Sequence, residues 1–397
     1  MKKSKIFAAA LSAAMVMTAF TGCNNGPAAG GDDAKDGDTV KIGLNYELSG
    51  DVAQYGQACV QGIEMAVKEL NAAGGVLGKQ IELVKIDNRS EASEAKNVAT
   101  RLADKEKVSA ILGPATSGAV KSASAAATQS KVPLISCSST TDDITNANGK
   151  VYDYIFRTCY TDTTQGSAMG NFAFDNLKAK KAVILSDTTS DYSKGLAAAF
   201  KKAFTAKGGS IVAEESFSSK DKEYSQILTK IKGQTFDVIY LPCYYTEGGL
   251  MIKQARALGI NQTFLGADGY DDTQLVEIVG DKNQVSNIYF TNHYSSNNDT
   301  DPKVKAFVEA FKTANNGVAP NSFNALGYDM AKFVVDAIAR ANSAEPEKVK
   351  DALAATKDFQ AVTGTFSMDS LHNPIKSTII VEYKNGEQYL KDKIDPQ

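Results

Sequence analysis

The sequence predicts an α/β protein built from two lobes, each a parallel sheet covered by helices. The chain has 397 residues, whereas a single hydrophobic core usually stops growing near about 250–300 residues. From Thr39 onward, short apolar runs alternate with longer amphipathic runs, which is typical of a parallel sheet with crossover helices. This alternation pauses after Ile135 and starts again at Ala182, so we expect two such sheets.

The first series of elements predicts one sheet with its helices. Residues 56–73 place Cys59, Ile63, Val67 and Leu70 on one face at helical spacing, so this helix is expected to bury that face. Strands are expected at 40–44, 81–86, 108–112 and 132–135, and helices at 56–73, 91–105 and 116–130.

The second series predicts the other sheet. Strands are expected at 182–185, 211–217, 238–241 and 264–265, and helices at 192–207, 224–232 and 248–258. In open parallel sheets, ligands bind beyond the carboxyl ends of the strands. Two lobes that face each other would therefore place those ends around a shared cleft.

The N-terminus is typical of an exported bacterial lipoprotein. Lys2, Lys3 and Lys5 precede an uncharged run over 6–20, which is too short to span a bilayer as a helix. The run ends at Gly22-Cys23, as in a lipobox. We expect residues 1–22 to be a signal peptide, Cys23 to carry a lipid on the outer face of the cell membrane, and residues 23–38 to be a flexible tether. A plain secretory signal with a chance cysteine is the alternative.

The net charge of the chain and the spacing of its cysteines argue against several classes of function. The formal net charge is −3 and no basic stripe is present, which argues against a nucleic-acid partner. The cysteines after Cys23 lack the spacing of a zinc or redox motif, and their spacing leaves open whether they pair. We expect them to be free, buried thiols. They are Cys59, Cys137, Cys159 and Cys243.

The sequence contains no recognisable catalytic motif. Residues 74–80 approach a P-loop, but Ala73 replaces its first glycine and Gln80 replaces its serine or threonine, so a turn is expected there. The two histidines, His293 and His372, have no metal or catalytic spacing, and no nucleophile elbow occurs. A triad assembled from distant residues stays open. We expect no enzyme activity, no metal and no cofactor.

An ordered series of segments resembles the branched-chain amino-acid binding proteins of ABC transporters. Each segment alone is weakly specific, but the series runs from about residue 39 to past residue 380 in the same order and follows a lipobox. The segments are Lys41-Ile42-Gly43-Leu44, Leu48 to Gly56, Asn71 to Val76 with Gly78-Lys79, Leu112-Gly113-Pro114 through Ser117, Pro133-Leu134-Ile135, Phe156-Arg157-Thr158, Tyr192 to Gly195, Tyr244 with Glu247, and Gly266 to Gly269.

The resemblance implies a type I periplasmic-binding-protein fold with three hinge crossings. One lobe would comprise 39–157 with 291–364, and the other 158–290 with 365–397. It also implies a monomer that captures a small molecule, with a branched-chain or other aliphatic amino acid as the leading ligand, and delivers it to ABC permease subunits and their ATPases. The alternatives are an amide, urea, a small peptide or an aromatic acid as ligand, for transport or for sensing.

Ser117 is supported by the sequence itself, because it follows a predicted strand at a predicted helix start. Backbone N–H groups and a hydroxyl there suit a carboxylate, although a simple helix cap would use the same residue type. The resemblance assigns Ser117 to the ligand's carboxylate, Ser138 and Thr140 to its ammonium and carboxylate groups, and Asp268 to the ammonium.

The remaining site residues are implied by the resemblance as well. Tyr192 would give a backbone N–H to the carboxylate, while Tyr55, Tyr244 and Phe323 would wall the side-chain pocket. The chain departs from the family pattern at Cys137-Ser138-Ser139-Thr140, where Pro-Ala-Ala-Thr is usual, and at Thr116, where some relatives carry a disulfide nearby. These departures bear on the specificity for the ligand's side chain more than on the recognition of the ligand's charged groups.

Overall fold

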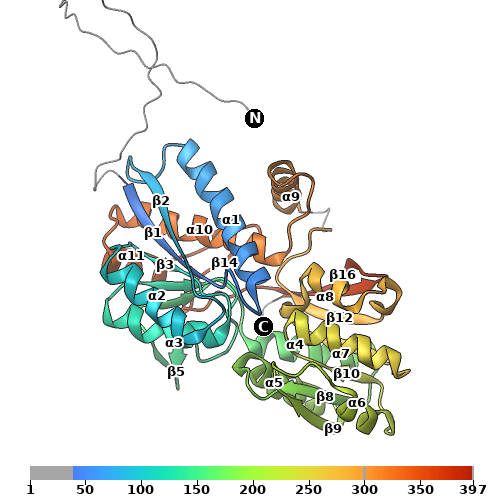
Figure 1. Ribbon diagram of the computed structural model, residues 1–397. Helices are drawn as coiled ribbons and strands as arrows, with labels where there is room; N and C mark the ends of the chain where they lie inside the picture. Colours follow the sequence, from blue (N-terminus) through green and yellow to red (C-terminus); the bar gives the residue numbers. More distant parts are fainter. Residues whose placement is uncertain (1–38, 298–300, 396–397) are drawn as a thin grey trace, which may run out of the picture. The chain divides into compact units, whose positions relative to one another are not determined.

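The computed structural model describes residues 39–297 and 301–395 (Figure 1). The predicted signal peptide, lipidated cysteine and tether, residues 1–38, lie outside the described residues. All the strands and helices expected from the sequence are present, with ends within three residues of those expected. Among the described residues, no helix has the length and apolar character needed to cross a bilayer.

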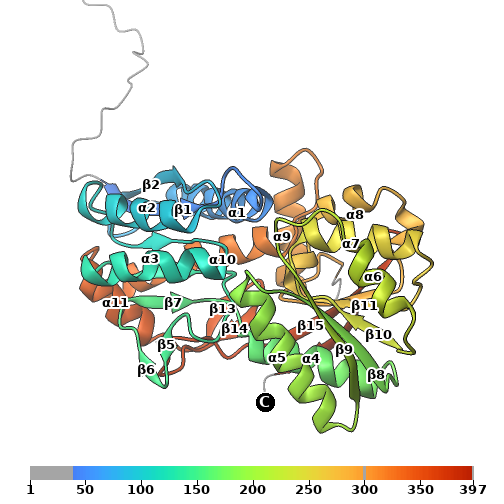
Figure 2. The same cartoon turned by 60° about the horizontal axis from the view of Figure 1, so that its bottom comes forward.

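The first sheet has five parallel strands in the order β2-β1-β3-β4-β7. Its strands are β1 (Thr39–Tyr46), β2 (Gln80–Asp87), β3 (Ile111–Leu112), β4 (Leu134–Ser136) and β7 (Ile155–Arg157). Its helices are α1 (Ala53–Ala72), α2 (Ala92–Asp104), α3 (Ser117–Gln129), α10 (Ser322–Ala341) and α11 (Pro346–Ala354). Helix α1 packs against α10, and α2 packs against α3 (Figure 2).

Both faces of this sheet are buried, because successive side chains of a strand point to opposite faces. Ile111, Leu134 and Ile155 lie in the hydrophobic cluster of α2 and α3. Their neighbours Leu112, Ile135 and Phe156 lie in the cluster that contains α1 and α10. The continuous apolar runs in the sequence therefore correspond to strands covered by helices on both sides.

The second sheet has seven strands in the order β16-β15-β12-β11-β10-β8-β9. Its strands are β8 (Lys181–Asp187), β9 (Ser210–Phe217), β10 (Val238–Tyr240), β11 (Thr263–Gly266), β12 (Ile288–Asn292), β15 (Thr378–Lys384) and β16 (Glu387–Ile394). Its helices are α4 (Asp162–Asp175), α5 (Asp191–Ala206), α6 (Ser225–Lys232), α7 (Tyr245–Ala257), α8 (Thr273–Val279) and the 3-10 turns η1 (Asp268–Tyr270) and η2 (Lys282–Gln284). Strands β15 and β16 are antiparallel additions to the predicted parallel sheet.

Smaller elements complete the described chain. They are the pair β5 (Asn146–Ala147) and β6 (Lys150–Val151), the pair β13 (Phe359–Ala361) and β14 (Gly364–Phe366), and helix α9 (Pro302–Ala314). The four cysteines of the described residues are buried free thiols, as expected.

The chain passes between the two sheets three times. It leaves the first sheet after β7, returns after β12 to form α10, and enters the second sheet again at β15. Arg157, at the first passage, is fully buried. Its guanidinium donates a hydrogen bond of 2.6 Å to the side-chain oxygen of Asn373, which lies on the third passage. Two connections distant in sequence are thereby fixed to one another.

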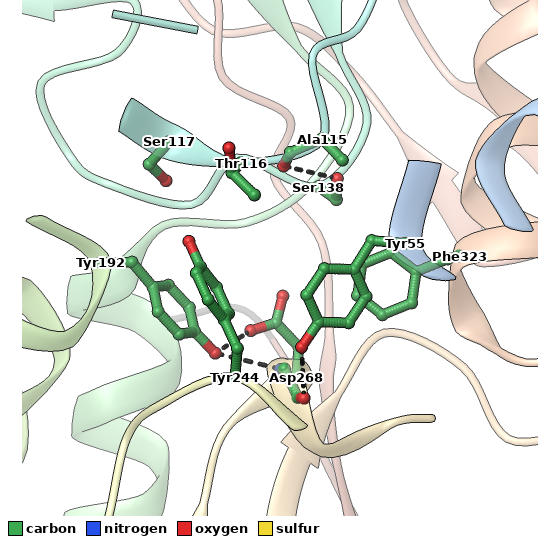
Figure 3. A pocket seen from close by; sticks show the side chains of 10 residues that line it. Tyr55, Ala115, Thr116, Ser117, Ser138, Tyr192, Tyr244, Asp268 and Phe323 are labelled. Carbon is green, nitrogen blue, oxygen red and sulfur yellow. Dashed lines mark hydrogen bonds between the residues drawn. The ribbon is translucent and has the colours of Figure 1, made fainter. Parts of the chain in front are cut away.

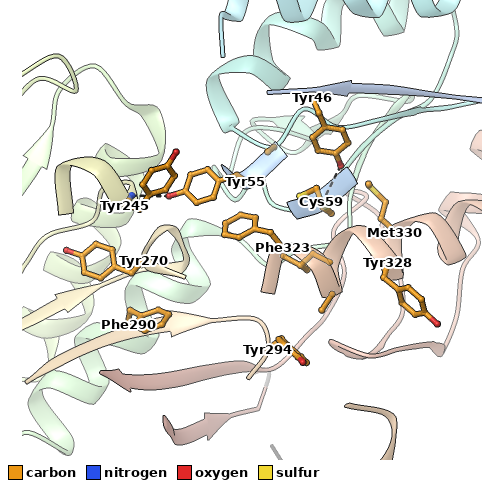
Figure 4. Packing of buried hydrophobic residues seen from close by; sticks show 14 of the residues in the cluster. Tyr46, Tyr55, Cys59, Tyr245, Tyr270, Phe290, Tyr294, Phe323, Tyr328 and Met330 are labelled. Carbon is orange, nitrogen blue, oxygen red and sulfur yellow. Dashed lines mark hydrogen bonds between the residues drawn. The ribbon is translucent and has the colours of Figure 1, made fainter. Parts of the chain in front are cut away.

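Helices α1 and α10 approach so closely that their backbones are in contact. A Cβ atom added at Gly62 would lie 2.0 Å from the carbonyl oxygen of Asn324, and one at Gly327 would lie 2.1 Å from that of Cys59. Real Cβ atoms do not approach backbone this closely, so only glycine fits at either position. The contact brings together Tyr55 at the start of α1 and Phe323 at the start of α10 (Figure 4).

We predict that Gly327→Ala lowers the free energy of unfolding by about 1–3 kcal/mol or more, because the helices must separate to admit the methyl group. Urea unfolding followed by circular dichroism measures this change. The control is Gly118→Ala on α3, where the added Cβ meets nothing within 4 Å and the change should be neutral or stabilising by about 0.5–1 kcal/mol. Equal stability of the two variants would contradict the prediction.

Candidate functional site

A pocket lies where the carboxyl ends of strands from both sheets meet. In each sheet the strand order reverses beside the pocket, at β1 and β3 in one and at β8 and β10 in the other, and such switch points leave a crevice. Its lining residues are Tyr55, Ala115, Thr116, Ser117, Ser138, Tyr192, Tyr244, Asp268, Gly269 and Phe323 (Figure 3). All but Phe323 follow the end of a parallel strand.

One end of the pocket is acidic. Asp268 follows β11 in η1 and is 2% exposed. The Tyr192 hydroxyl donates to Asp268 Oδ1 at 2.7 Å, and the same hydroxyl accepts the N–H of Gly269 at 3.0 Å. Burial, with the neighbouring carboxylate of Asp268, raises the pKa of Tyr192 well above its ordinary value, so this phenol keeps its proton and remains a donor.

The other end of the pocket offers neutral donors. Helix α3 begins at Ser117, and Thr116 at its N-cap makes no side-chain hydrogen bond to the first turn. The first N–H groups of a helix carry a partial positive charge and suit an anion. The described residues that line the pocket include no lysine or arginine. An anionic group there would therefore be held by hydroxyl and backbone N–H groups.

Glu47 fixes the loop that precedes α3. This carboxylate follows β1, is fully buried, and accepts the N–H of Ala115 at 3.0 Å. It also accepts the N–H and hydroxyl of Thr116, at 3.1 and 2.8 Å. Burial raises the pKa of Glu47, while these hydrogen bonds act in the opposite direction. The loop lining the pocket is thus anchored to the end of β1.

Aromatic rings form the apolar wall of the pocket. Tyr55 stacks on Phe323 with ring centroids 4.4 Å apart and meets Tyr244 edge-on at 5.5 Å. Tyr244 in turn stacks on Tyr192 at 5.2 Å. Figure 3 shows the carboxylate of Asp268 between the rings of Tyr192 and Tyr244 on one side and those of Tyr55 and Phe323 on the other. Rings that support one another in this way give a pocket a fixed shape.

Direct contacts close the pocket between elements of the two sheets. The Tyr55 hydroxyl donates to the carbonyl oxygen of Gly269 at 2.6 Å and accepts the N–H of Tyr245 at 3.1 Å. The Tyr245 ring packs edge-on against Tyr55 (Figure 4). At another point, Lys121 on α3 forms an ion pair of 2.9 Å with Asp191 on α5. Tyr55 therefore both lines the pocket and joins its two sides.

The structure brings together seven of the eight residues predicted for the site. The exception is Thr140, which is fully buried outside the lining and whose carbonyl oxygen accepts the N–H of Asp162 at 2.7 Å. Tyr192 contributes its hydroxyl and ring, whereas the resemblance implied its backbone N–H. The seven are Tyr55, Ser117, Ser138, Tyr192, Tyr244, Asp268 and Phe323.

Two residues that support the site were not expected from the sequence. Glu47 stands directly after β1, so the rule that functional residues follow strand ends could have identified it. His293 stands directly after β12 and contacts Asp268, so the same rule applies to it. Both residues lie behind the pocket lining and contact residues that form it. The spacing of residues in the sequence does not predict such contacts.

The arrangement is suited to binding. A small molecule would find an anionic hydrogen-bond acceptor, Asp268, at one end, neutral donors at the other and an aromatic wall between them. Among the described residues, no cluster of three or more histidine, cysteine, aspartate or glutamate side chains could hold a metal ion. The pocket can hold a compact molecule that carries a cationic group, an anionic group and an apolar part.

Comparisons with known proteins find relatives that match most of the chain. The chain is 31% identical to the leucine-, isoleucine-, valine-, threonine- and alanine-binding protein of Pseudomonas aeruginosa, over 84% of this chain and 86% of that protein. It is similar to the substrate binding protein LivJ of Streptococcus pneumoniae, solved in complex with isoleucine, with 42% identity, a TM-score of 0.83, and coverage of 90% of this chain and 99% of that one. The leucine binding protein LivK of Thermotoga maritima gives 36% identity, a TM-score of 0.84 and the same coverage.

The family model described as periplasmic binding protein matches residues 39–388. This match covers most of the chain and confirms the resemblance, while the likeness to the two solved structures confirms the two-sheet fold expected from it. Members of this family bind solutes outside the cytoplasm and are not enzymes, which agrees with the expectation drawn from the motifs. The chain belongs to the periplasmic binding protein family.

Proposed function

We propose that this protein captures a branched-chain amino acid in the pocket between its two lobes and delivers it to the permease of an ABC importer. The observation that carries the proposal is the polarity of the pocket, with a buried carboxylate at one end and an uncapped helix N-terminus at the other. A free amino acid is a zwitterion, and buried charges must be paired and hydrogen-bonded. The names of the relatives, which include an isoleucine complex at 42% identity, support this ligand class.

In this proposal each pocket residue has a defined role. Asp268 pairs with the ligand ammonium, while Ser117, the first turn of α3 and the loop at Ser138 hold the carboxylate. Tyr192 keeps Asp268 in place through its hydroxyl. Tyr55, Tyr244 and Phe323 pack against the aliphatic side chain. A direct contact from Thr140 stays a prediction, because this residue lies outside the pocket lining.

We also propose that the two sheets are the cores of lobes that open and close about the three crossings. One lobe would comprise 39–157 with 291–364 and the other 158–290 with 365–397. Ligand-induced hinge closure is common among such proteins. The contacts from Tyr55 to Gly269 and from Lys121 to Asp191 would form on closing.

We predict that Asp268→Asn weakens binding of isoleucine and leucine by roughly 30-fold to several thousand-fold, because truncating a buried charged pair costs about 2–5 kcal/mol. Ser117→Ala should cost less, about 1.5–3 kcal/mol, since it removes a neutral partner of a charged group. Tyr244→Phe should be mildest because the ring remains. Isothermal titration calorimetry measures each affinity.

The matched control is Asp329→Asn. Asp329 is also buried and hydrogen-bonded, to the N–H groups of Val362 and Thr363, but it does not line the pocket. This variant should lose stability and keep its affinity. If Asp268→Asn is folded by circular dichroism and binds with unchanged affinity, recognition of an amine at this site is refuted.

We further propose that a lipid on Cys23 anchors the protein outside the cell membrane, because Gly22-Cys23 ends the uncharged run and the tether follows. We predict that Cys23→Ser moves the protein from the membrane fraction to the soluble extracytoplasmic fraction. Cys243→Ser is the matched control and should leave it in the membrane fraction. Retention of the Cys23→Ser protein in the membrane with unchanged mass would exclude the anchor.

A further inference from the structure

The carboxylate of Asp268 has a second buried partner besides Tyr192. His293 Nε2 lies 3.1 Å from Asp268 Oδ2, and both side chains are almost completely buried. One neighbour therefore contacts each carboxylate oxygen, Tyr192 at Oδ1 and His293 at Oδ2. Each oxygen can accept more than one hydrogen bond, so both retain the capacity to bind a further donor in the pocket.

The surroundings of His293 favour a neutral ring that carries its proton on Nε2. The ring stacks on Tyr160 with centroids 3.7 Å apart. Among the described residues, Nδ1 of His293 has no hydrogen-bond partner, so a second ring proton would be buried without an acceptor. Burial lowers the pKa of His293. Asp268 and Asp271 oppose this effect, and Lys376 adds to it.

His293 is also held in place through the backbone. Its N–H donates to the side-chain oxygen of Asn292 at 2.8 Å. The amide of Asn292 donates to Asp271 Oδ2, which also accepts the first N–H of α10, from Ser322. The histidine is thus fixed at the end of β12, where the chain leaves the second sheet, and it has little freedom to leave Asp268.

We propose that His293 is a positioning residue that acts through Asp268 to make the pocket selective for ligands with an ammonium group. A neutral N–H holds the carboxylate in one orientation without cancelling its negative charge, whereas a cationic neighbour at this point would compete with the ligand. Without the N–H, Oδ2 would lose its buried donor, and the ionised carboxylate would be disfavoured in the closed pocket. This inference rests on the proposed function of Asp268.

The test compares leucine with isocaproate, which is leucine without its amine, by calorimetric titration and competition. His293→Phe keeps an aromatic ring against Tyr160 and removes the donor, and we expect it to weaken leucine binding about 10- to 100-fold. Isocaproate binding should change by less than about 3-fold. His293→Gln restores a neutral N–H near the position of Nε2 and should recover most of the leucine affinity.

The control is His372→Asn. His372 is also a buried ring stacked on an aromatic, Phe156, but its Nδ1 contacts a backbone carbonyl and it does not line the pocket. Its backbone has a positive φ, which asparagine tolerates. Removing this ring should lower stability and leave both ligand affinities unchanged. A loss of stability alone is therefore not expected to weaken leucine binding relative to isocaproate binding.

The outcomes separate this inference from the proposed function. If Asp268→Asn abolishes leucine binding while folded His293→Phe binds leucine within twofold of the unchanged protein, the inference fails and the function stands. Equal losses of leucine and isocaproate in His293→Phe would show a merely structural role. If Asp268→Asn itself has no effect, the proposed function fails. In the Asp268→Asn background, the His293→Phe effect should largely disappear.

A spectroscopic measurement applies even if His293→Phe does not fold. The chain has two histidines, so long-range proton–nitrogen NMR spectra of the leucine complex can be assigned by comparison with His372→Asn. We expect His293 to be neutral with its proton on Nε2 at pH 7. A doubly protonated ring, or a proton on Nδ1, would overturn the inference.

Discussion

The buried carboxylate of Asp268 is the group on which the rest of the site depends. Asp268 is 2% exposed and lies beside hydrogen-bond donors. The described residues that line the pocket include no lysine or arginine. An ionised group in such a position is costly unless its hydrogen bonds are satisfied. Tyr192 and His293 satisfy them partly and leave the charge available. The polarity of the pocket, and the class of molecule that it suits, follow from this arrangement.

The fold provides this arrangement through its topology. Parallel strands end at the same edge of a sheet, and the reversal of strand order opens a gap between the helices that follow. Ser117 and Ser138 stand beyond one sheet, while Tyr244 and Asp268 stand beyond the other. Neither sheet alone supplies both the acidic end and the donor end. A pocket complementary to both charges of a zwitterion therefore requires the two sheets together.

Much of this organisation could be predicted from the sequence, because buried parallel strands form apolar runs and their helices have a 3.6-residue period. The antiparallel strands β15 and β16 were not foreseen, since no element had been predicted after Leu265 and strand direction is set by pairing. The site residues were predicted largely through the resemblance. Asp268 is one aspartate among many, and it was distinguished by the match of the segment Gly266 to Gly269 to the family pattern.

The residues that support the site were harder to predict. Glu47 and His293 act on loops or side chains that are distant in sequence, so their partners become evident only when the sheets are assembled. Arg157 illustrates the same limit. Its motif position was recognised, but its hydrogen bonds to the carbonyl oxygens of Thr141 and Asp142 depend on the three-dimensional course of the loop after β4.

If the lobes open and close as proposed, Tyr55 serves both closure and recognition, and this has a thermodynamic consequence. Tyr55 lines the pocket and also joins its two sides through Gly269 and Tyr245. A ligand shifts an equilibrium between open and closed forms only by its difference in affinity for the two. In the proposed binding mode, Ser117 and Asp268 contact opposite ends of the ligand from different sheets. Both contacts form together only when the pocket is closed, so a ligand that carries both charged groups favours the closed form more strongly than a ligand that lacks either one.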